Sequence, residues 1–384
     1  MVHVVVLGIG MIGTTVVREL VSSSSIDQIS AVDGMSKNVD KCLETIANPK
    51  VVGKCANLQT EEEIFEVIKD ADVAIACLPH ALSLAATNAA IAAKCHLVDL
   101  VGSEYEEKMT LDKKAKDAGI IIVPGAGVAP GLTNLLAAQG IELLDEADEA
   151  VMVCGGIPSK PLPPLWYQVV FRLESVMGLY TRPALAAENG KIVTLPPLSG
   201  LEKMAFPDPV GECEAVITDA HSVAYTLKDK VKKIYEKTVR YAGHWSKMSM
   251  LSELGFLDDD LIDFDGVEIS PKKFSEKILE PKMRGKSNED ITVVRVTVKG
   301  KKNKKKVTYT WESIDFYDHD REITSMAKMT AVPAVLMAVW ISKHKIPKTG
   351  VVPIERIMVG QRFNAFIKDL DHRGIEINFN EQVE

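Results

Sequence analysis

The first residues that could do chemistry form a glycine-rich loop close to the N-terminus. Its positions are Gly8, Ile9, Gly10, Met11, Ile12 and Gly13, and all but Ile9 are predicted ligand contacts. The loop follows an apolar run at 3–7 and precedes a helical pattern at 14–21, so it lies where a strand passes into a helix. In a Gly-x-Gly-x-x-Gly motif the glycines permit a tight turn, close approach of a pyrophosphate, and close packing of helix on strand. The motif therefore predicts a dinucleotide whose phosphates bind at a helix N-terminus.

An acidic residue stands where such a site needs one. Asp33 lies 20 positions after Gly13, at the end of the next strand pattern. A carboxylate there accepts hydrogen bonds from both ribose hydroxyls of NAD and repels the 2′-phosphate of NADP. The sequence therefore predicts NAD as the cofactor. The alternative is that Asp33 only caps the Asp33-Gly34 turn, because Asp-Gly is a common turn pair.

Two more strand ends supply candidate cofactor contacts. Leu78, Pro79 and His80 follow a strand pattern, and Asp99 falls at the end of the next one. The carboxyl ends of parallel strands form the edge along which a bound dinucleotide extends towards its nicotinamide. Pro79 lacks an N–H and so suits a strand end. We expect these residues near the cofactor; for His80 and Asp99 a capping or exposed position is the alternative.

The elements that must position these residues alternate through the first third of the chain. Strand patterns occur at 3–7, 29–32, 73–77, 96–100 and 120–123, and helical patterns at 14–21, 61–69, 82–94 and 106–118. Strands that are apolar on both faces belong to a sheet covered by helices on both sides. We therefore predict the α/β class. The sheet is a Rossmann, doubly wound parallel sheet over residues 1–125, completed by a helix from about 325–345.

The pattern changes after Pro124. Proline-rich turns separate strand-like runs, which predicts a second, α+β domain for substrate binding and dimerisation over 126–384. Runs at 291–298 and 307–311 flank a lysine-rich segment at 299–306 and predict a long hairpin with a basic tip. No aromatic residue interleaves these lysines, so we interpret the tip as a solvated loop.

Composition excludes several classes of protein. The 384 residues are 46% hydrophobic and 26% charged, ordinary values for a globular chain of two or three domains. The 45 basic and 53 acidic residues give a net charge of −8, which does not favour nucleic acid or a membrane surface as a partner. The late apolar stretch at 329–341 is too short to span a bilayer. The six cysteines show no metal-binding or redox spacing, so we expect free thiols, no metal site and a cytoplasmic location.

Several segments together resemble a known family. They are GAGVAPGLTN at 125–134, GGIP at 155–158, PPLWY at 163–167, YTRPA at 180–184 and RYAGH at 240–244. In this order they resemble the saccharopine dehydrogenase family, most nearly its NAD-dependent L-lysine 6-dehydrogenase branch. The resemblance implies a homodimeric enzyme that binds the nicotinamide between a Rossmann domain and a substrate domain. It also implies oxidation of L-lysine at the ε-amino carbon to ammonia and 2-aminoadipate 6-semialdehyde, which cyclises to piperideine carboxylate.

The resemblance also marks residues of the substrate domain. Arg182 and His244 stand in segments more similar to the lysine enzymes than to the saccharopine reductases. Asp219 matches an aspartate that Gly-Leu-Arg usually follows, whereas Ala-His-Ser follows here. Arg172 is a candidate to replace the missing arginine. Alternatively, the substrate is not lysine.

Oxidation of an amine requires two kinds of side chain. A lysine ammonium has a pKa of about 10.4 and must lose a proton before its carbon gives up a hydride, so a base is needed. His244 is the candidate base because an ordinary histidine titrates near neutral pH; a buried core histidine is the alternative. The substrate carboxylate needs the fork of an arginine. The candidates are Arg182, Arg172 and Arg240, in that order, with a surface salt bridge as the alternative for each.

Two other functions remain open. One is a saccharopine reductase or another imine reductase of the family, which condenses an aldehyde with an amine and reduces the product. The other is a non-catalytic NAD-binding regulator, although the substrate-domain segments argue against it. Cys154 is interpreted as a buried thiol rather than a nucleophile, because no paired base is evident. A sheet in the strand-rich second domain would need its edge covered, which also favours a homodimer.

Overall fold

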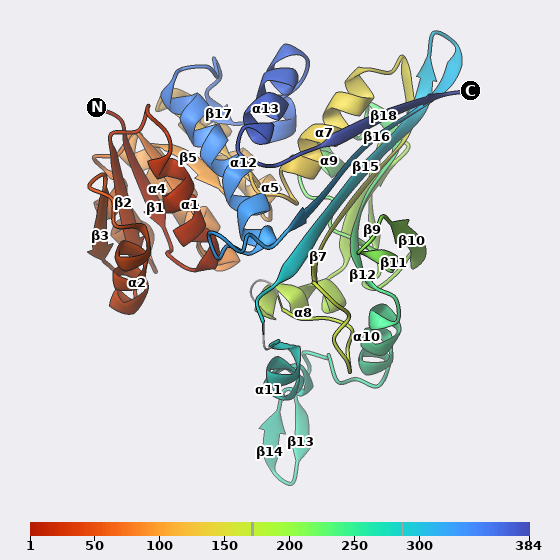
Figure 1. Ribbon diagram of the computed structural model, residues 1–384. Coiled ribbons are helices and arrows are strands. Elements are labelled where there is room, and N and C mark those ends of the chain that lie inside the picture. The colour runs from red at the N-terminus through yellow and green to blue at the C-terminus, as the bar shows by residue number, and fades with distance from the viewer. Residues whose placement is uncertain (170–172, 286) are drawn as a thin grey trace. The chain divides into compact units, whose positions relative to one another are not determined.

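The computed structural model describes residues 1–169, 173–285 and 287–384, and the chain divides into two compact units (Figure 1). Unit 1 comprises Met1–Glu142 and Ala327–Glu376, and unit 2 comprises Leu143–Met326 and Ile377–Glu384. Unit 1 therefore extends beyond the expected boundary at 125. The reason is that the helix after that boundary packs against a C-terminal segment, and both belong to unit 1.

The sheet of unit 1 is parallel, in the order β17-β6-β5-β4-β1-β2-β3. Its strands are β1 (His3–Leu7), β2 (Gln28–Asp33), β3 (Val51–Cys55), β4 (Val73–Ala76), β5 (His96–Asp99), β6 (Ile121–Val123) and β17 (Gly350–Val351). The first six strands have the order of a Rossmann fold, whose topological switch point lies between β1 and β4. The predicted α/β class and doubly wound sheet are confirmed.

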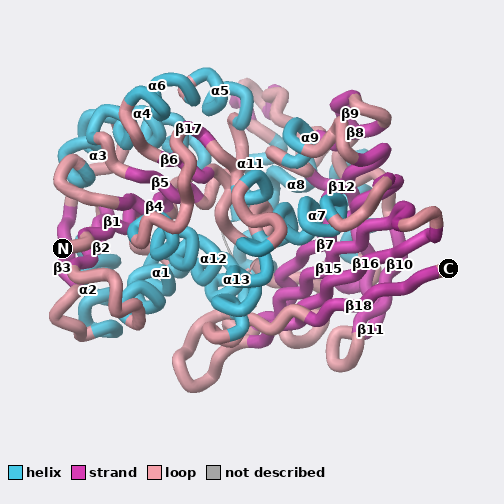
Figure 2. The backbone as a smooth tube through the Cα atoms, turned by 90° about the horizontal axis from the view of Figure 1, so that it is seen from above, coloured by secondary structure: helices cyan, strands magenta, loops and turns pink. Residues whose placement is uncertain are grey.

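Helices cover both faces of this sheet, as Figure 2 shows. They are α1 (Met11–Val21), α2 (Ser36–Ile46), α3 (Glu61–Ile68), η1 (His80–Leu82), α4 (Ser83–Ala93), α5 (Tyr105–Thr110), α6 (Asp112–Asp117), α7 (Leu132–Glu142), α12 (Ser325–Ser342), η2 (Ile354–Arg356) and α13 (Gln361–Asp371). The strands between them are buried, and Val4, Val5 and Val6 of β1 have no exposed surface. Burial of these apolar side chains on both faces accounts for the near-absence of polar residues in the strands.

Several elements of unit 1, among them α2 and β3, lie where the sequence predicts neither helix nor strand. β3 is partly exposed and contains Gly53 and Lys54, so it lacks an apolar run. Gly53 is required by packing, because a Cβ there would lie 2.5 Å from Val39 and 2.7 Å from Leu43 of α2. The helix predicted at 106–118 is divided into α5 and α6.

The helix α12 has the length and apolar composition of a membrane span, yet 89% of that segment is buried within the protein. The core helix of a globular domain has the same composition, because its whole circumference is buried. The expected completing helix at about 325–345 corresponds to α12, most of which belongs to unit 1.

Unit 2 is built on a mixed sheet with the central order β10-β11-β12-β7-β15-β16-β18, and β8 joins β12 to β9. Its strands are β7 (Glu146–Pro158), β8 (Ala184–Glu188), β9 (Lys191–Leu195), β10 (Glu202–Phe206), β11 (Gly211–Thr218), β12 (Val231–Tyr241), β15 (Asp290–Lys302), β16 (Lys305–Phe316) and β18 (Asn378–Val383). Only β12 and β7 run parallel to each other; the other pairs recorded in this sheet are antiparallel.

Two apolar clusters cover the two faces of this sheet. One includes Val153, Val239 and Val293. The other includes Val216 and residues of α8 (Leu173–Thr181), α10 (His244–Glu253) and α11 (Pro271–Met283). A short helix, α9 (Val223–Thr226), lies beside β8 and β12. A small hairpin of β13 (Ile262–Phe264) and β14 (Val267–Ile269) stands apart from the large sheet. Figure 1 shows it projecting beside α11.

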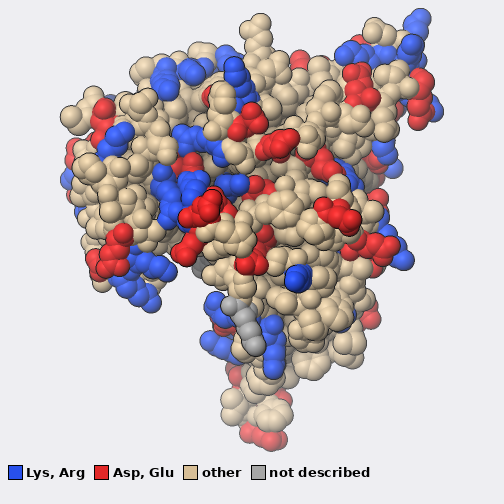
Figure 3. Space-filling view, in the orientation of Figure 1, with Lys and Arg blue, Asp and Glu red and all other residues tan. Residues whose placement is uncertain are grey.

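The predicted hairpin with a basic tip is formed by β15 and β16, which pair along their whole length. Its lysines lie beside acidic residues, with Lys301 2.9 Å from Glu146 and Lys299 3.5 Å from Glu149. Figure 3 likewise shows acidic and basic side chains interspersed on the face that it presents. The local charge of the tip is therefore partly balanced by neighbouring carboxylates.

Candidate functional site

The glycine loop of unit 1 has the geometry that its motif predicts. Gly8 has a φ of +87° and lies so close to the end of β4 that a Cβ would be 2.7 Å from the carbonyl oxygen of Cys77. At Gly13 a Cβ would lie only 1.9 Å from the carbonyl oxygen of Gly8. Gly10 is different: among the described residues no atom lies within 4 Å of where its Cβ would be. An open space in front of Gly10, at the N-terminus of α1, fits a bound pyrophosphate.

Asp33 ties the loop to the end of β2. Its Oδ2 accepts a hydrogen bond from the backbone N–H of Ile9 at 2.7 Å. Its Oδ1 accepts from the N–H of Met35 at 2.8 Å and from Nδ2 of Asn38 at 3.1 Å. The bond to Met35 is the turn contact that the alternative interpretation requires, whereas the bond to Ile9 reaches the glycine loop. Asp33 thus performs the capping role, and its bond to Ile9 also places its carboxylate beside the glycine loop.

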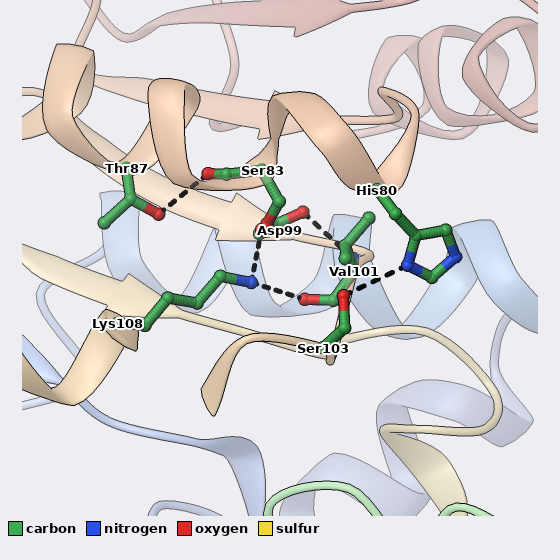
Figure 4. Close-up of polar contacts among 7 residues, drawn as sticks. All are labelled: His80, Ser83, Thr87, Asp99, Val101, Ser103 and Lys108. Carbon is green, nitrogen blue, oxygen red and sulfur yellow. Dashed lines mark hydrogen bonds and ion pairs between the residues drawn. The ribbon is translucent and has the colours of Figure 1, made fainter. Parts of the chain in front are cut away.

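Asp99 is enclosed by protein, as Figure 4 shows. It accepts hydrogen bonds from the Ser83 hydroxyl and from the N–H of Val101, and it pairs with Lys108 at 3.1 Å. Both charged side chains are buried, and Lys108 Nζ also donates to the carbonyl oxygen of Val101 at 2.9 Å. These contacts match the capping alternative for Asp99, because its carboxylate holds the backbone after β5.

Leu78, Pro79 and His80 lie at the end of β4 as expected, and His80 begins η1. The His80 ring is exposed, and its Nδ1 lies 3.1 Å from the Ser103 hydroxyl (Figure 4). The segments that follow β4 and β5 are therefore connected at the edge of the sheet. Of the two polar residues predicted at this edge, His80 is exposed, whereas Asp99 is buried.

The substrate candidates lie in unit 2, where Arg240 of β12 is buried and Arg182 is exposed. Its guanidinium stacks over the Tyr167 ring at 4.3 Å, and Nη1 donates to the carbonyl oxygen of Val239 at 2.8 Å. In the described part of the chain, no carboxylate pairs with this guanidinium and its Nε has no hydrogen-bond partner. A buried guanidinium without an acidic partner is suited to binding an anion.

His244 starts α10 beside Arg240 and is fully buried. Its Nδ1 lies 2.8 Å from the carbonyl oxygen of Leu165 and therefore donates to it, which leaves Nε2 to accept from the Tyr180 hydroxyl at 3.0 Å. Burial, followed by the positive charge of Arg240, lowers the pKa of His244 to about 3. This corrects the expectation that the ring titrates near neutral pH: the imidazole is neutral and orients Tyr180.

The remaining candidates are less enclosed. Arg182 is exposed and lies against Gly178 of its own helix. Asp219 is partly exposed after β11; its Oδ1 accepts from the N–H of His221, and its Oδ2 lies 3.5 Å from the His221 ring. Arg172 lies outside the described residues. Cys154 is buried, and burial raises the pKa of its thiol, which fits the interpretation as an unreactive thiol.

Sequence reasoning missed Glu236, Tyr167, Tyr180 and Lys108. Glu236 stands two and four residues from Thr238 and Arg240 on β12, so the period of a strand places the three on one face. The two tyrosines lie in segments that carry the family resemblance, but their contacts with His244 and Arg240 depend on residues far along the chain. The role of Lys108 had no signal, because it depends on a segment that folds back onto Asp99.

Comparison with known proteins identifies the family. Residues 4–123 match the model of the saccharopine dehydrogenase NADP binding domain, and residues 127–375 match that of the saccharopine dehydrogenase C-terminal domain. The chain belongs to the saccharopine dehydrogenase family. The predicted resemblance is thus confirmed at family level, and unit 1 carries the pyridine-nucleotide-binding domain of that family.

Individual relatives are distant. The chain is 25% identical over 296 residues to the mitochondrial alpha-aminoadipic semialdehyde synthase of Bos taurus, covering 72% of this chain but only 31% of that protein. It is 23% identical over 380 residues to carboxyaminopropylagmatine dehydrogenase of Synechocystis sp., covering 93% of both. A structure of apo saccharopine dehydrogenase (L-Glu forming) from Saccharomyces cerevisiae matches over the whole of both chains with a TM-score of 0.82 and 17% identity. That similarity concerns the fold alone.

The glycine loop allows the roles of two glycines to be separated. Gly10→Ala should leave the free energy of unfolding within about 0.5 kcal/mol of the native value, because its methyl group meets no described atom. It should nevertheless weaken NADH binding roughly tenfold or more, since the methyl group fills the pyrophosphate position. Gly13→Ala should instead destabilise the fold by about 1–3 kcal/mol through its contact with Gly8. Urea unfolding and NADH fluorescence titration measure both effects; undiminished NADH binding by Gly10→Ala would exclude this phosphate site.

The burial of His244 predicts how stability depends on pH. Its pKa is about 3 in the folded chain and about 6.5 when unfolded. The unfolded state therefore binds more protons between these values, so the free energy of unfolding falls as the pH drops below about 6.5. One such group contributes a slope of up to about 1.4 kcal/mol per pH unit. Urea unfolding from pH 7 to 4.5 should show a shallower slope for His244→Gln and an unchanged slope for His372→Gln at an exposed position. Equal slopes for native protein and His244→Gln would contradict the assignment.

Proposed function

We propose that the chain is an NAD-dependent oxidoreductase that removes a hydride from the amine-bearing carbon of an amino acid, and that L-lysine is oxidised at its ε-carbon. The products are ammonia and 2-aminoadipate 6-semialdehyde, which cyclises to piperideine carboxylate. Family membership across both units supports the reaction class. The observation that carries the substrate class is the buried guanidinium of Arg240, which has no carboxylate partner in the described part of the chain and suits the carboxylate of an amino acid.

Each unit has a separate task in this proposal. The glycine loop and Asp33 hold the dinucleotide, which supplies the hydride acceptor when bound. Arg240 holds the substrate carboxylate, and Tyr167 under the guanidinium fixes its plane. His244 is a positioning residue, because its neutral ring accepts from Tyr180 and keeps a second positive charge away from Arg240. We therefore do not assign the removal of the substrate proton to His244.

The second candidate is reduction of an imine formed from an aldehyde and an amine, as in a saccharopine reductase. It is favoured by the Synechocystis relative, which matches nearly the whole chain and whose name specifies carboxyaminopropylagmatine as substrate. It is also favoured by the Ala-His-Ser segment after Asp219, which departs from the lysine enzymes. Arg240 serves both candidates, since both substrates carry a carboxylate.

The substrate proposal predicts a selective effect at Arg240. With NAD and L-lysine the native protein should produce NADH between pH ~7 and 10, the range in which the ammonium begins to lose its proton. Arg240→Lys should raise KM for lysine roughly tenfold or more and change the reaction of 1,5-diaminopentane little, because that diamine has no carboxylate. Arg284→Lys is the matched control at an exposed position of the same unit. NADH formation with saccharopine or another secondary amine, and none with lysine, would instead establish the second candidate.

The preference for NAD is tested at Asp33. We expect kcat/KM for NAD to exceed that for NADP by roughly tenfold or more, because the carboxylate repels a 2′-phosphate. Asp33→Ser should raise KM for NAD and reduce this discrimination. Asn38→Ala removes one contact of the carboxylate while keeping its charge, so it should preserve the preference. Equal use of both cofactors by the native protein would contradict the proposal.

We also propose a cytoplasmic homodimer that forms through unit 2. Its support is an exposed apolar surface on the β13–β14 hairpin and α11, formed by Leu261, Ile262, Phe264, Val267 and Phe274. Surfaces of this kind are typical of protein–protein contacts. Light scattering should give twice the chain mass of 42.0 kDa. Phe264→Glu should shift the protein to monomer, and Val52→Glu, which alters an exposed apolar residue of unit 1, should not. A native monomer at working concentration would remove this proposal.

A further inference from the structure

Four buried side-chain atoms of unit 2 lack a hydrogen-bond partner among the described residues. They are Oε2 of Glu236, Nε of Arg240, Oγ1 of Thr292 and Nδ1 of His221. Buried polar atoms are nearly always paired, because leaving one unpaired costs about 1–3 kcal/mol. Their concentration in one unit indicates a place where a polar ligand completes the hydrogen bonding.

The strand register places three of these residues on one face of the sheet. Glu236 and Arg240 are four residues apart on β12, so they point to the same side as Thr238, and Thr238 pairs across the sheet with Cys154 of β7. Cys154 pairs in turn with Val294 of β15, two residues from Thr292. The face is the one covered by α8 and α10, because Val216, which packs under those helices, pairs with Thr238.

Glu236 is an acidic residue without a cation. It is 5% exposed, and no described lysine, arginine or histidine lies within ion-pair distance of it. The titratable groups that influence it are Asp219, beyond the end of β11, and Cys154. Burial, and then the charge of Asp219, raises the pKa of the Glu236 carboxyl well above its ordinary value. A positive charge brought to this carboxyl would relieve both effects.

The turn that follows β11 carries an acidic group whose charge acts on Glu236, namely Asp219. The Asp219 side chain there is 37% exposed and the His221 side chain 18% exposed. His221 has a φ of +51° and turns its ring towards Asp219, with the two groups 3.5 Å apart. This turn carries an acidic group at the surface, so it would attract a cation towards the buried carboxyl behind it.

We propose that Glu236 binds the protonated amine of the ligand, opposite a carboxylate held by Arg240 on the same strand. The two residues are four positions apart, a Cα separation of about 13 Å at roughly 3.3 Å per residue. Both side chains are long and both influence Cys154, which lies between them. The ligand is therefore an amino acid whose cationic amine and carboxylate are separated by several carbons. This inference rests on the proposed function for the identity of the carboxylate subsite.

Binding of simple analogues tests the subsite without turnover. The probes are 6-aminohexanoate, which has both charges, and hexanoate, which lacks the amine. Calorimetry uses the full chain with NADH present, so that no hydride acceptor is available. We expect 6-aminohexanoate to bind saturably and hexanoate to bind roughly tenfold more weakly or worse. Glu236→Gln should lower the affinity for 6-aminohexanoate by a similar factor and leave the affinity for hexanoate unchanged.

Two controls separate ligand binding from folding. Glu212→Gln removes the same charge from the exposed surface of neighbouring β11 and should leave binding unchanged. The melting temperature of Glu236→Gln should equal or exceed that of the native protein, because a buried acid without a partner does not stabilise the fold. Glu236→Asp keeps a carboxylate on a shorter side chain, so its affinity for 6-aminohexanoate should lie between those of Glu236→Gln and the native protein.

The outcomes also distinguish this inference from the proposed function. Unchanged 6-aminohexanoate affinity in Glu236→Gln, or no saturable binding by the native protein, overturns the ammonium subsite even where lysine oxidation is observed. Loss of affinity in Glu236→Gln alone supports the subsite even where no amine reduces NAD, in which case only the reaction assignment fails.

Discussion

The burial of Arg240 is the constraint on which the arrangement of unit 2 depends. A guanidinium that is removed from water must be compensated, and among the described residues no carboxylate does this. The compensation comes instead from the face of Tyr167 and from the carbonyl oxygen of Val239. Nη2 also donates to the Tyr167 hydroxyl at 3.4 Å, and Nε is left without a partner among the described residues. An internal salt bridge would have been more stable alone, but it would have occupied the group that an anionic ligand needs.

The neutral state of His244 follows from the same constraint. A charged imidazole next to Arg240 would place two cations in a buried cluster, so burial and the guanidinium both lower the pKa of the ring. The neutral ring can donate to Leu165 and accept from Tyr180 at the same time, which fixes the tautomer and the direction of the tyrosine hydroxyl. In unit 1, by contrast, the buried charges of Asp99 and Lys108 neutralise each other. The pair holds the backbone beyond β5, because Lys108 also donates to the carbonyl oxygen of Val101.

The fold of unit 1 was predictable from sequence because its signals are local. The apolar strands, the glycine loop and Asp33 each follow from residue type and spacing. β3 escaped prediction because it is half exposed, and Gly53 is explained only by its contact with α2. The sequence placed Asp99 correctly at a strand end, yet whether its carboxylate is free depends on Lys108 folding back over it. His244 was recognised as part of the substrate domain, but its protonation depends on burial, which spacing does not reveal. The glycine loop and Arg240 remain as predicted candidates in positions that suit a ligand.

Distant proteins can share this fold, so the fold alone does not indicate which substrate is bound. The side chains at the site must indicate it. The chain and the saccharopine dehydrogenase of Saccharomyces cerevisiae share only 17% of their residues, yet the fold matches over their whole lengths. Few residues are needed to maintain it: glycines at close approaches, such as Gly13 and Gly155, and apolar residues at buried strand positions. The inward positions of β12 are not restricted in this way, because a strand tolerates any side chain whose polar groups find partners. Glu236 and Arg240 occupy two such positions, and among the described residues Oε2 of Glu236 and Nε of Arg240 have no hydrogen-bond partner. Because unpaired buried polar atoms are costly, these two side chains are better explained by what they bind than by what they stabilise.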